Sequence, residues 1–499
     1  ERRAKMNATT KERVNSKYIV KLTLGLIIIF VLGNAVPTWG PVTCTGVQAI
    51  CMFFGLIYML SNSEFGLILP ALLGFTALVM TDAFDPPALI AATFGNTVVA
   101  QIIFAYVCCQ LIISTGAAEF ISKWLLARKN LEGRPHLFTF VFFIAAWIMG
   151  AFAHIGGIVF NFTLLDSLLV TIDEEEEGKL ARWLSLGTFI SAAIGMGLIP
   201  FQGLPLVIFG SIMTAMSKNG ITLNYGTYML SVIIFSILLI LAFNFAIKAS
   251  KVDISKLRSF DPKSINNDGE SLKATSSQVI AIIIFFFGIS YSILGAFIPK
   301  GTALGKIFET FDQCTWFILA LSIFFMLRQE GKPILNAEKT FRSGISWSIV
   351  LTVCVFNVIG GMMANPAFGV RIWLNQILAP IFTGMPFPVF ILVICLVGTL
   401  CTNFFANAAV GLIIGTLTMP FAIAYSKTIG INVTVYGACV TMSAMFAFLT
   451  LASSGYAPLL LTRPCIQKHQ NFIWGIGSAT LIIGALLMAI VFTVLAYIL

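Results

Sequence analysis

Residues 399–420 read Thr-Leu-Cys-Thr-Asn-Phe-Phe-Ala-Asn-Ala-Ala-Val-Gly-Leu-Ile-Ile-Gly-Thr-Leu-Thr-Met-Pro. This stretch is apolar, but its first half carries Thr402, Asn403 and Asn407. Unpaired amides at membrane depth are costly, so such residues face a cavity, a ligand or another helix. The alanines and glycines around them allow close approach of the backbone. We therefore expect part of a re-entrant hairpin whose tip lines a binding site.

The same pattern occurs a second time, 253 positions earlier in the chain. Residues 405–407 (Phe-Ala-Asn) match residues 152–154 (Phe-Ala-His) at this offset. Residues 458–459 (Pro-Leu) match residues 205–206 without a gap. Weak internal symmetry of this kind is typical of transporters built from repeated halves, and chance agreement between apolar segments is the alternative.

Composition limits the class of protein. Of the 499 residues, 58% are hydrophobic and 10% are charged, whereas soluble domains carry about 25% charged residues. We therefore expect an all-α polytopic membrane protein. The net charge of +9 indicates basic loops beside anionic lipid rather than a nucleic-acid partner. The ten cysteines show no metal-ligand spacing.

Apolar segments long enough to span a bilayer predict about eleven transmembrane helices. Two regions, 137–170 and 384–425, are polar in the middle and are predicted as hairpins. Two further spans, 185–215 and 432–462, contain Gly/Pro clusters, so we expect broken helices there. The predicted spans are 18–37, 45–61, 64–81, 94–116, 185–215, 228–248, 277–297, 314–327, 345–362, 432–462 and 470–498.

The order of these segments predicts two repeats. Residues 1–44 form a tail and a first helix, 45–250 the first repeat, 251–276 a polar linker and 277–499 the second repeat. Lys and Arg cluster in the tail, in the loops and in the linker, which favours a cytoplasmic N-terminus. The two hairpins then enter from opposite sides, as inverted repeats require.

The hairpin tips and the helix breaks supply the candidate binding residues. Helix N-termini suit a carboxylate, and hydroxyl and carbonyl oxygens suit a hard cation such as sodium. The candidate substrate-binding residues are His154, Gly156, Gln202, Gly203, Asn403, Asn407, Ser453, Ser454 and Gly455. The candidate sodium ligands are Thr402, Asn407, Thr450 and Ala452.

Three charged or titratable residues in apolar sequence leave alternatives open. His154 either donates to an anionic substrate, titrates and couples transport to protons, or packs as a neutral side chain. Asp166 pairs either with a cation or with a neighbouring helix. Arg371 either attracts an anion or extends to the membrane surface.

The layout resembles the divalent anion/sodium symporter family of the ion transporter superfamily. The resemblance covers residues 45–499 and is clearest at residues 402–408 and 452–458. The hairpin tips of that family carry Ser-Asn-Thr. The second tip here, Ala406-Asn407-Ala408, keeps only the Asn, and the first, Ala153-His154-Ile155, keeps none. The resemblance implies a homodimer that carries a small anion with sodium by an elevator movement and needs no further cofactor.

We therefore expect a secondary active transporter of a small organic anion of the carboxylate class, coupled to sodium, in the plasma (inner) membrane. An anion exchanger or a proton-coupled carrier using His154 is the alternative. An intramembrane enzyme is not expected, because the sequence has no His-x-x-x-His and no paired aspartates within its apolar segments.

Overall fold

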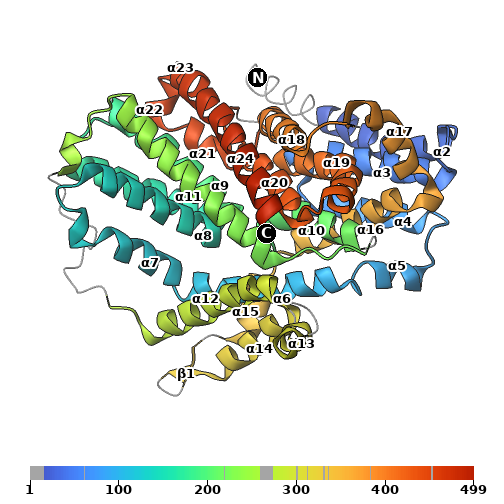
Figure 1. Cartoon of the computed structure of the whole chain (residues 1–499), viewed down its shortest axis with the longest axis horizontal. Helices are drawn as coiled ribbons and strands as arrows, with labels where there is room; N and C mark the ends of the chain where they lie inside the picture. Colours follow the sequence, from blue (N-terminus) through green and yellow to red (C-terminus); the bar gives the residue numbers. More distant parts are fainter. Residues whose placement is uncertain are drawn as a thin grey trace, which may run out of the picture. The chain divides into compact units, whose positions relative to one another are not determined.

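A computed structural model describes the chain over residues 16–60, 62–217, 220–258, 273–298, 302–311, 313–329, 332–334, 336–382, 384–450 and 453–499. The regular secondary structure of the described part is helical except for one antiparallel pair of two-residue strands, β1 (Arg328–Gln329) and β2 (Lys332–Pro333) (Figure 1). In that pair Arg328 lies opposite Pro333 and Gln329 opposite Lys332. The predicted all-α class therefore holds apart from this short ladder.

Five described helices are long and apolar enough to cross a membrane, as expected of a helical integral membrane protein. They cover Ser16–Ala35, Pro135–Thr171, Tyr225–Ala249, Asn407–Ile429 and Gln470–Ile498. The other apolar helices are shorter, so the predicted count of eleven spans stays a prediction. The sequence did not predict the helices at Pro86–Ala92, Ala117–Leu126, Ala303–Thr310, Ala337–Gly344 and Val370–Phe382.

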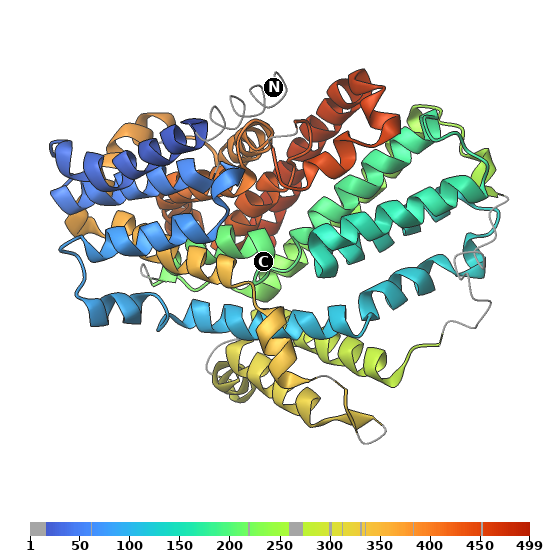
Figure 2. The same ribbon diagram turned by 180° about the vertical axis from the view of Figure 1, so that it is seen from behind.

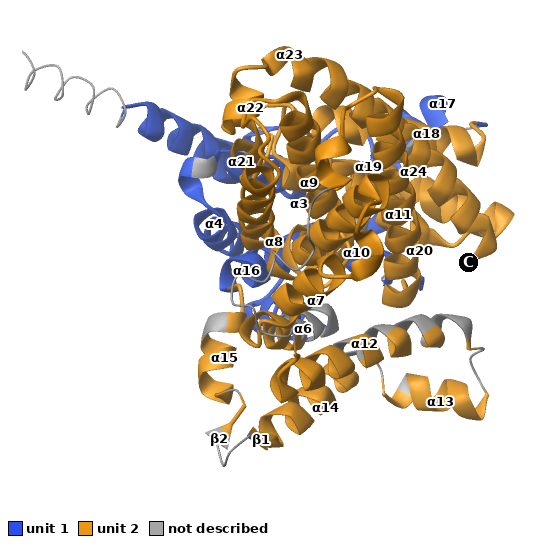
Figure 3. Cartoon of the chain, turned by 90° about the vertical axis from the view of Figure 1, so that its left-hand side faces the viewer, with its two compact units in different colours: residues 1–100, 213–221, 347–384 blue, residues 101–212, 222–346, 385–499 orange. Residues whose placement is uncertain are grey.

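The chain divides into two compact units, coloured separately in Figure 3. Unit 1 contains residues 1–100, 213–221 and 347–384, and unit 2 contains the remainder. Each predicted repeat therefore contributes to both units. The helices of unit 1 are η1 (Ile27–Leu32), α2 (Gly33–Ala35), α3 (Cys44–Leu60), η2 (Ser63–Phe65), α4 (Ile68–Val79), α5 (Pro86–Ala92), α16 (Trp347–Ala364), η6 (Pro366–Phe368) and α17 (Val370–Phe382).

Unit 2 contains every described candidate site residue. Two of its helices, α6 (Thr97–Ser114) and α10 (Gly203–Ser217), extend into unit 1. Its other helices are α7 (Ala117–Leu126), η3 (Lys129–Leu131), α8 (Pro135–Thr171), α9 (Lys179–Met196), α11 (Tyr225–Ala249), η4 (Ser255–Arg258), α12 (Ser276–Phe297), α13 (Ala303–Thr310), α14 (Gln313–Met326), α15 (Ala337–Gly344), α18 (Phe387–Cys401), α19 (Asn407–Ile429), α20 (Val433–Ala444), α21 (Ala457–Leu461), α22 (Pro464–Gln467), α23 (Gln470–Phe472), η7 (Ile473–Gly477) and α24 (Ser478–Ile498).

Helix α8 is two helices joined at a reversal. His154, with φ 49° and ψ −125°, has non-helical backbone. The limbs on either side of it pack together, because Asn161 Nδ2 donates to the Ala146 carbonyl at 3.1 Å. A Cβ added to Gly157 would lie 2.3 Å from the Met149 carbonyl oxygen. The first predicted hairpin is thus a helical hairpin, called hairpin 1 from here (residues 135–171).

The second predicted hairpin, hairpin 2 (residues 387–429), consists of α18, a loop at residues 402–406 and α19. Both predicted broken helices are also interrupted. The first consists of α9 and α10 with residues 197–202 between them, and the second of α20 and the short α21 with a break at 445–456. The first break contains Gly197 and Pro200, and the second contains Gly455, with Pro458 in the first turn of α21, and such residues interrupt helices.

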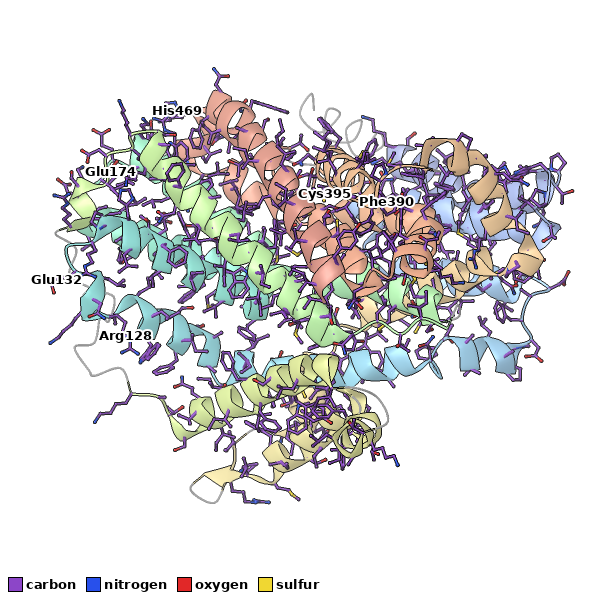
Figure 4. All side chains as sticks on the ribbon, in the orientation of Figure 1. Arg128, Glu132, Glu174, Phe390, Cys395 and His469 are labelled. Atoms are coloured by element: carbon purple, nitrogen blue, oxygen red, sulfur yellow. The ribbon has the colours of Figure 1, made fainter. Side chains whose placement is uncertain are left out.

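Helices far apart in sequence pack side by side in unit 2. Helix α8 packs on α9, and both contact α11 (Figures 1 and 2). In the second half, α18 packs on α20, and both contact α24. Helix α18 runs parallel to α20, since Cys395 meets Cys439 with sulfurs 3.3 Å apart and Gly398 meets Ser443 further along both helices. Phe390 and Cys395 are labelled on α18 in Figure 4.

The first broken helix and α20 run in opposite directions. Gly197 packs against Met442, whereas Phe209 packs against Gly437, so residue numbers rise along one helix as they fall along the other. Equivalent elements also begin at nearly constant spacing. Helix α9 begins at 179 and α20 at 433, and hairpin 1 begins at 135 and hairpin 2 at 387.

Candidate functional site

The tip of hairpin 1 rests on the break in the first broken helix. A Cβ added to Gly203 would lie 2.5 Å from Cε1 and 2.9 Å from Nδ1 of His154. Gly203 also has φ +58°, a left-handed conformation that glycine adopts without steric cost. The imidazole therefore packs directly on the backbone at the N-terminus of α10, and both predicted residues lie together.

Gln202 completes this contact. Its side chain interacts with His154 and is only 4% exposed. Within the described part of the chain, neither Gln202 Oε1 nor His154 Nε2 has a hydrogen bond of ordinary geometry, and both atoms are buried. Each unsatisfied buried group costs about 1–3 kcal/mol. The strained backbone of His154 adds a cost of about the same size. Costs of this kind cluster at ligand clamps and active sites.

The tip of hairpin 2 is held by a hydrogen bond at the corresponding place. Asn407 is the first residue of α19, and its Nδ2 donates to Tyr456 Oη at 3.2 Å. Its Oδ1 accepts from the Ala408 N–H at 3.0 Å. Tyr456 Oη in turn donates to the Met445 carbonyl at 3.4 Å. Asn407 is half-buried, so the predicted residue sits at a tip that other groups can reach.

The two tip contacts occupy matched positions. Asn407 lies 253 positions after His154, and Tyr456 lies 253 positions after Gly203. In each half, the tip residue of the hairpin thus touches the start of the helix that follows the break. The sequence offset did not include Tyr456, because a tyrosine and a glycine share no identity at this position.

Asn403 does not fit its predicted role as a substrate ligand. Its Nδ2 donates to the carbonyls of Thr399 and Phe446, both at 2.7 Å. Its Oδ1 accepts from the N–H groups of Phe448 at 2.9 Å and Leu449 at 2.8 Å. The amide is fully buried and all four of its hydrogen-bonding positions are used. Asn403 therefore fixes the loop of hairpin 2 against the second break.

Four hydroxyl groups surround the same loop and break. Each donates to a backbone carbonyl, so each oxygen keeps lone pairs that can coordinate a cation. Thr402 donates to Ala444 at 3.1 Å, Thr450 to Asn403 at 2.5 Å, Ser453 to Thr450 at 2.7 Å and Ser454 to Ala447 at 3.0 Å. Ala452, a predicted sodium ligand, lies outside the described residues.

The donor set contains no carboxylate. Among the described residues, no three His, Cys, Asp or Glu side chains gather where they could hold a metal ion. Neutral hydroxyl and carbonyl oxygens suit a monovalent hard cation better than Ca²⁺ or Mg²⁺, whose sites rely on carboxylates. The oxygens described at hairpin 2 are neutral hydroxyl and carbonyl groups, which are hard donors.

Two helix N-termini lie side by side near the tips. A Cβ on Gly411 would lie 2.2 Å from Cδ1 of Ile208, and one on Gly415 would lie 3.0 Å from Cδ1 of Ile212. Residue numbers rise together along the two helices, so α10 and α19 run parallel in close contact. Their N-termini, at Gly203 and Asn407, consequently lie at the same level. Both carry partial positive charge, which favours an anion.

The space beside the tips is open in several places. A Cβ on Gly156 or on Gly455 would meet nothing within 4 Å, and both predicted glycines are exposed. Two aromatic residues that the sequence did not single out, Phe404 and Phe405, are 59% and 62% exposed on the loop of hairpin 2.

Asp166 pairs with a residue that sequence reasoning missed. It forms an ion pair with Arg463, which follows α21. Of the two partners predicted for Asp166, a cation or a neighbouring helix, the structure shows a residue of a neighbouring segment, the basic side chain of Arg463. Arg371 lies on α17 in unit 1 and is half-buried.

No protein-family model matches the sequence, and no curated protein matches it either.

Proposed function

We propose that the protein is a secondary active transporter of a small organic anion of the carboxylate class, coupled to sodium and working by an elevator-type alternating access. The observation that carries this proposal is the pair of matched tip contacts. His154 rests on Gly203 and Asn407 bonds to Tyr456, so each helical hairpin touches the break in its own half. Transporters place substrate and coupling ions at discontinuous helices of this kind.

The charge distribution supports an anionic substrate. The N-termini of α10 and α19 lie at one level, and the amide of Asn407 stands at one of them. Aligned peptide dipoles and free N–H groups favour a carboxylate there. We assign the coupling sodium to the hydroxyl groups around hairpin 2, with Thr402 and Thr450 as its first candidate ligands.

The helix directions support two inverted repeats. Helix α20 runs against the first broken helix, although it occupies the matching position in the second half. The second limb of hairpin 2 runs parallel to α10, as it must if the two hairpins point in opposite directions. A homodimer in the plasma (inner) membrane with a cytoplasmic N-terminus completes this proposal, and transport rather than catalysis is its chemistry.

The test is uptake of labelled carboxylates into proteoliposomes with and without an inward sodium gradient. Asn407→Ala should lower uptake about tenfold, because it removes a hydrogen bond to a charged group. Asn224→Ala is the matched control, since Asn224 caps α11 by accepting from the Thr227 N–H at 3.0 Å. Uptake of no carboxylate under any cation gradient would contradict transport, and equal uptake in both variants would remove Asn407 from the site.

The second candidate is an anion exchanger or a proton-coupled carrier, and the buried, unpaired Nε2 of His154 favours it. Uptake by this carrier should depend on a pH gradient and lose that dependence in His154→Gln. A pH dependence that survives in His154→Gln would exclude His154 as the titrating group, and a strict sodium requirement would favour the first candidate.

A further inference from the structure

Arg463 joins three elements of unit 2 through one side chain. Its Nη2 donates to Asp166 Oδ1, and its Nη1 lies 3.4 Å from Asp166 Oδ2. Asp166 belongs to the second limb of hairpin 1, whereas Arg463 lies between α21 and α22. The side chain of Arg463 is only 11% exposed, whereas that of Asp166 is 56% exposed. A two-point contact of this kind fixes orientation as well as distance.

The same guanidinium makes two more contacts. Its Nε donates to Ser185 Oγ on α9 at 3.1 Å. Its Cζ lies 4.4 Å from the ring centroid of Phe162, one turn before Asp166 on the hairpin limb. Arg463 therefore holds hairpin 1, the first broken helix and the end of the second broken helix in one fixed arrangement.

The Asp166 side of this contact leads to the tip of hairpin 1, and the Arg463 side leads to the tip of hairpin 2. Twelve helical residues separate Asp166 from His154, about 18 Å along the limb. On the other side, α21 links Arg463 to Tyr456, the partner of Asn407. We propose that Arg463 is a positioning residue that couples the two tips, so that a displacement at either tip is transmitted to the other. This coupling does not depend on which anion, if any, the protein carries.

The arrangement occurs once, although the hairpins are matched. At 253 positions further on, Asp166 and Ser185 correspond to Met419 and Ala438, which cannot form an ion pair or bond to a guanidinium. The ion pair therefore has no counterpart at the matched positions, and it adds a fixed contact to the packing between the halves, in which the ring of Phe189 on α9 lies 5.8 Å from that of Tyr456.

A neighbouring ion pair supplies the matched control. Lys468 pairs with Glu177, so it too joins the segment after hairpin 1 to the segment after α21. Its side chain is 63% exposed, however, and exposed pairs contribute little. Figure 4 labels His469, which follows Lys468, and Glu174, three residues before Glu177.

The experiment measures how fast an introduced cysteine at position 156 or at position 455 reacts with a maleimide. Both positions are glycines with open space, one beside each tip. The label at each position is read by peptide mass, in the full chain in detergent. Asp166→Asn and Arg463→Gln should each raise the rate about tenfold at both positions, because either change removes the two-point contact that orients the hairpin limb against the end of the second broken helix.

The charge exchange Asp166→Arg with Arg463→Asp should restore the slow rates at least in part. Lys468→Gln should leave the labelling rates at positions 156 and 455 unchanged. Melting temperature in the same samples separates coupling from general unfolding, since an unfolded chain would react at all cysteines. An effect of Asp166→Asn confined to position 156, or an equal effect of Lys468→Gln, would overturn the coupling. Transport itself is not measured, so failure here is distinct from failure of the proposed function.

Discussion

Asn403 and Asn407 lie four residues apart, and the sequence alone makes both candidate substrate ligands and Asn407 a candidate sodium ligand as well. The structure separates them by the number of bonds that the protein already makes to each amide. Asn403 uses all four positions, whereas Asn407 uses its side chain for one contact to Tyr456 and one to its own helix. A saturated amide holds a loop, and a partly used amide can bind a ligand.

This difference predicts that substitution by alanine affects mainly stability at position 403 and mainly transport at position 407. Asn403→Ala leaves two carbonyls and two N–H groups unpaired in a buried place, so it should destabilise the fold by about 2–4 kcal/mol. Asn407→Ala should cost about 1 kcal/mol or less while lowering transport. Denaturant or thermal unfolding in detergent measures both. A larger stability loss in Asn407→Ala would contradict the assignment.

The packing of His154 on Gly203 predicts a coupled pair of substitutions. Gly203→Ala places a methyl group 2.5 Å from the imidazole and forces alanine into φ +58°, so it should destabilise by about 2–4 kcal/mol. Adding His154→Ala should recover the part that comes from the clash and leave about 1–2 kcal/mol of backbone strain. A double-mutant cycle on unfolding free energies measures the recovery. Purely additive losses would show that the two residues do not touch.

At the scale of elements, glycines decide how closely hairpin 1 packs on α9. A Cβ on Gly150 would lie 2.1 Å from the Ala192 carbonyl oxygen, and one on Gly195 would lie 2.1 Å from that of Trp147. Gly150→Ala should therefore destabilise by about 3 kcal/mol, because the backbones must separate. Gly156→Ala, on the same hairpin with open space, should be neutral or stabilise by up to about 1 kcal/mol. Unfolding measurements that rank the two variants the other way would contradict this packing.

The loop after hairpin 1 is also tied to the linker. Lys256 Nζ lies 2.9 Å from Glu174 Oε2 and donates to the Asp173 carbonyl at 2.6 Å. The hydrogen bond to Glu174 raises the pKa of Lys256 above its ordinary value. The stabilisation is therefore complete below the unfolded pKa of about 10.4 and is lost as pH rises through the folded value. Melting temperatures of the native protein and Lys256→Gln should converge as the pH rises above the ordinary lysine pKa and through the raised one; a gap that widens there would contradict this sign.

The elements that sequence predicted best are the interrupted ones. Polar or Gly/Pro clusters inside apolar runs located both hairpins and both breaks, since few other structures tolerate such clusters at membrane depth. The short helices were missed for the opposite reason. Helix α7 follows α6 after only two residues, with Gly116 at φ +68° making the turn, so hydropathy continues across the boundary. Arg463 was missed because its partner Asp166 is 297 positions away, and no local pattern joins them.

At the scale of the molecule, sequence order and compact units divide the chain differently. The predicted repeats follow each other in the chain, but each gives its hairpin and broken helix to unit 2 and other helices to unit 1. The site residues thus come from both halves of the sequence and lie in one unit. No sequence pattern could have shown this grouping of the site residues in one unit, because it depends on long-range packing.

Inverted repeats make a prediction about the two faces of the membrane. The base of hairpin 1 carries Glu175 and the base of hairpin 2 carries Lys427, both exposed. If the hairpins point in opposite directions, cysteines introduced at 175 and 427 should react from opposite sides of the membrane. In intact cells, a membrane-impermeant maleimide should label position 427, and position 175 only after permeabilisation, with peptide mass identifying the site. Labelling of both positions from one side would exclude inverted repeats. If position 175 were labelled in intact cells and position 427 only after permeabilisation, the repeats would still be inverted, but the N-terminus would lie on the opposite side of the membrane from the one expected.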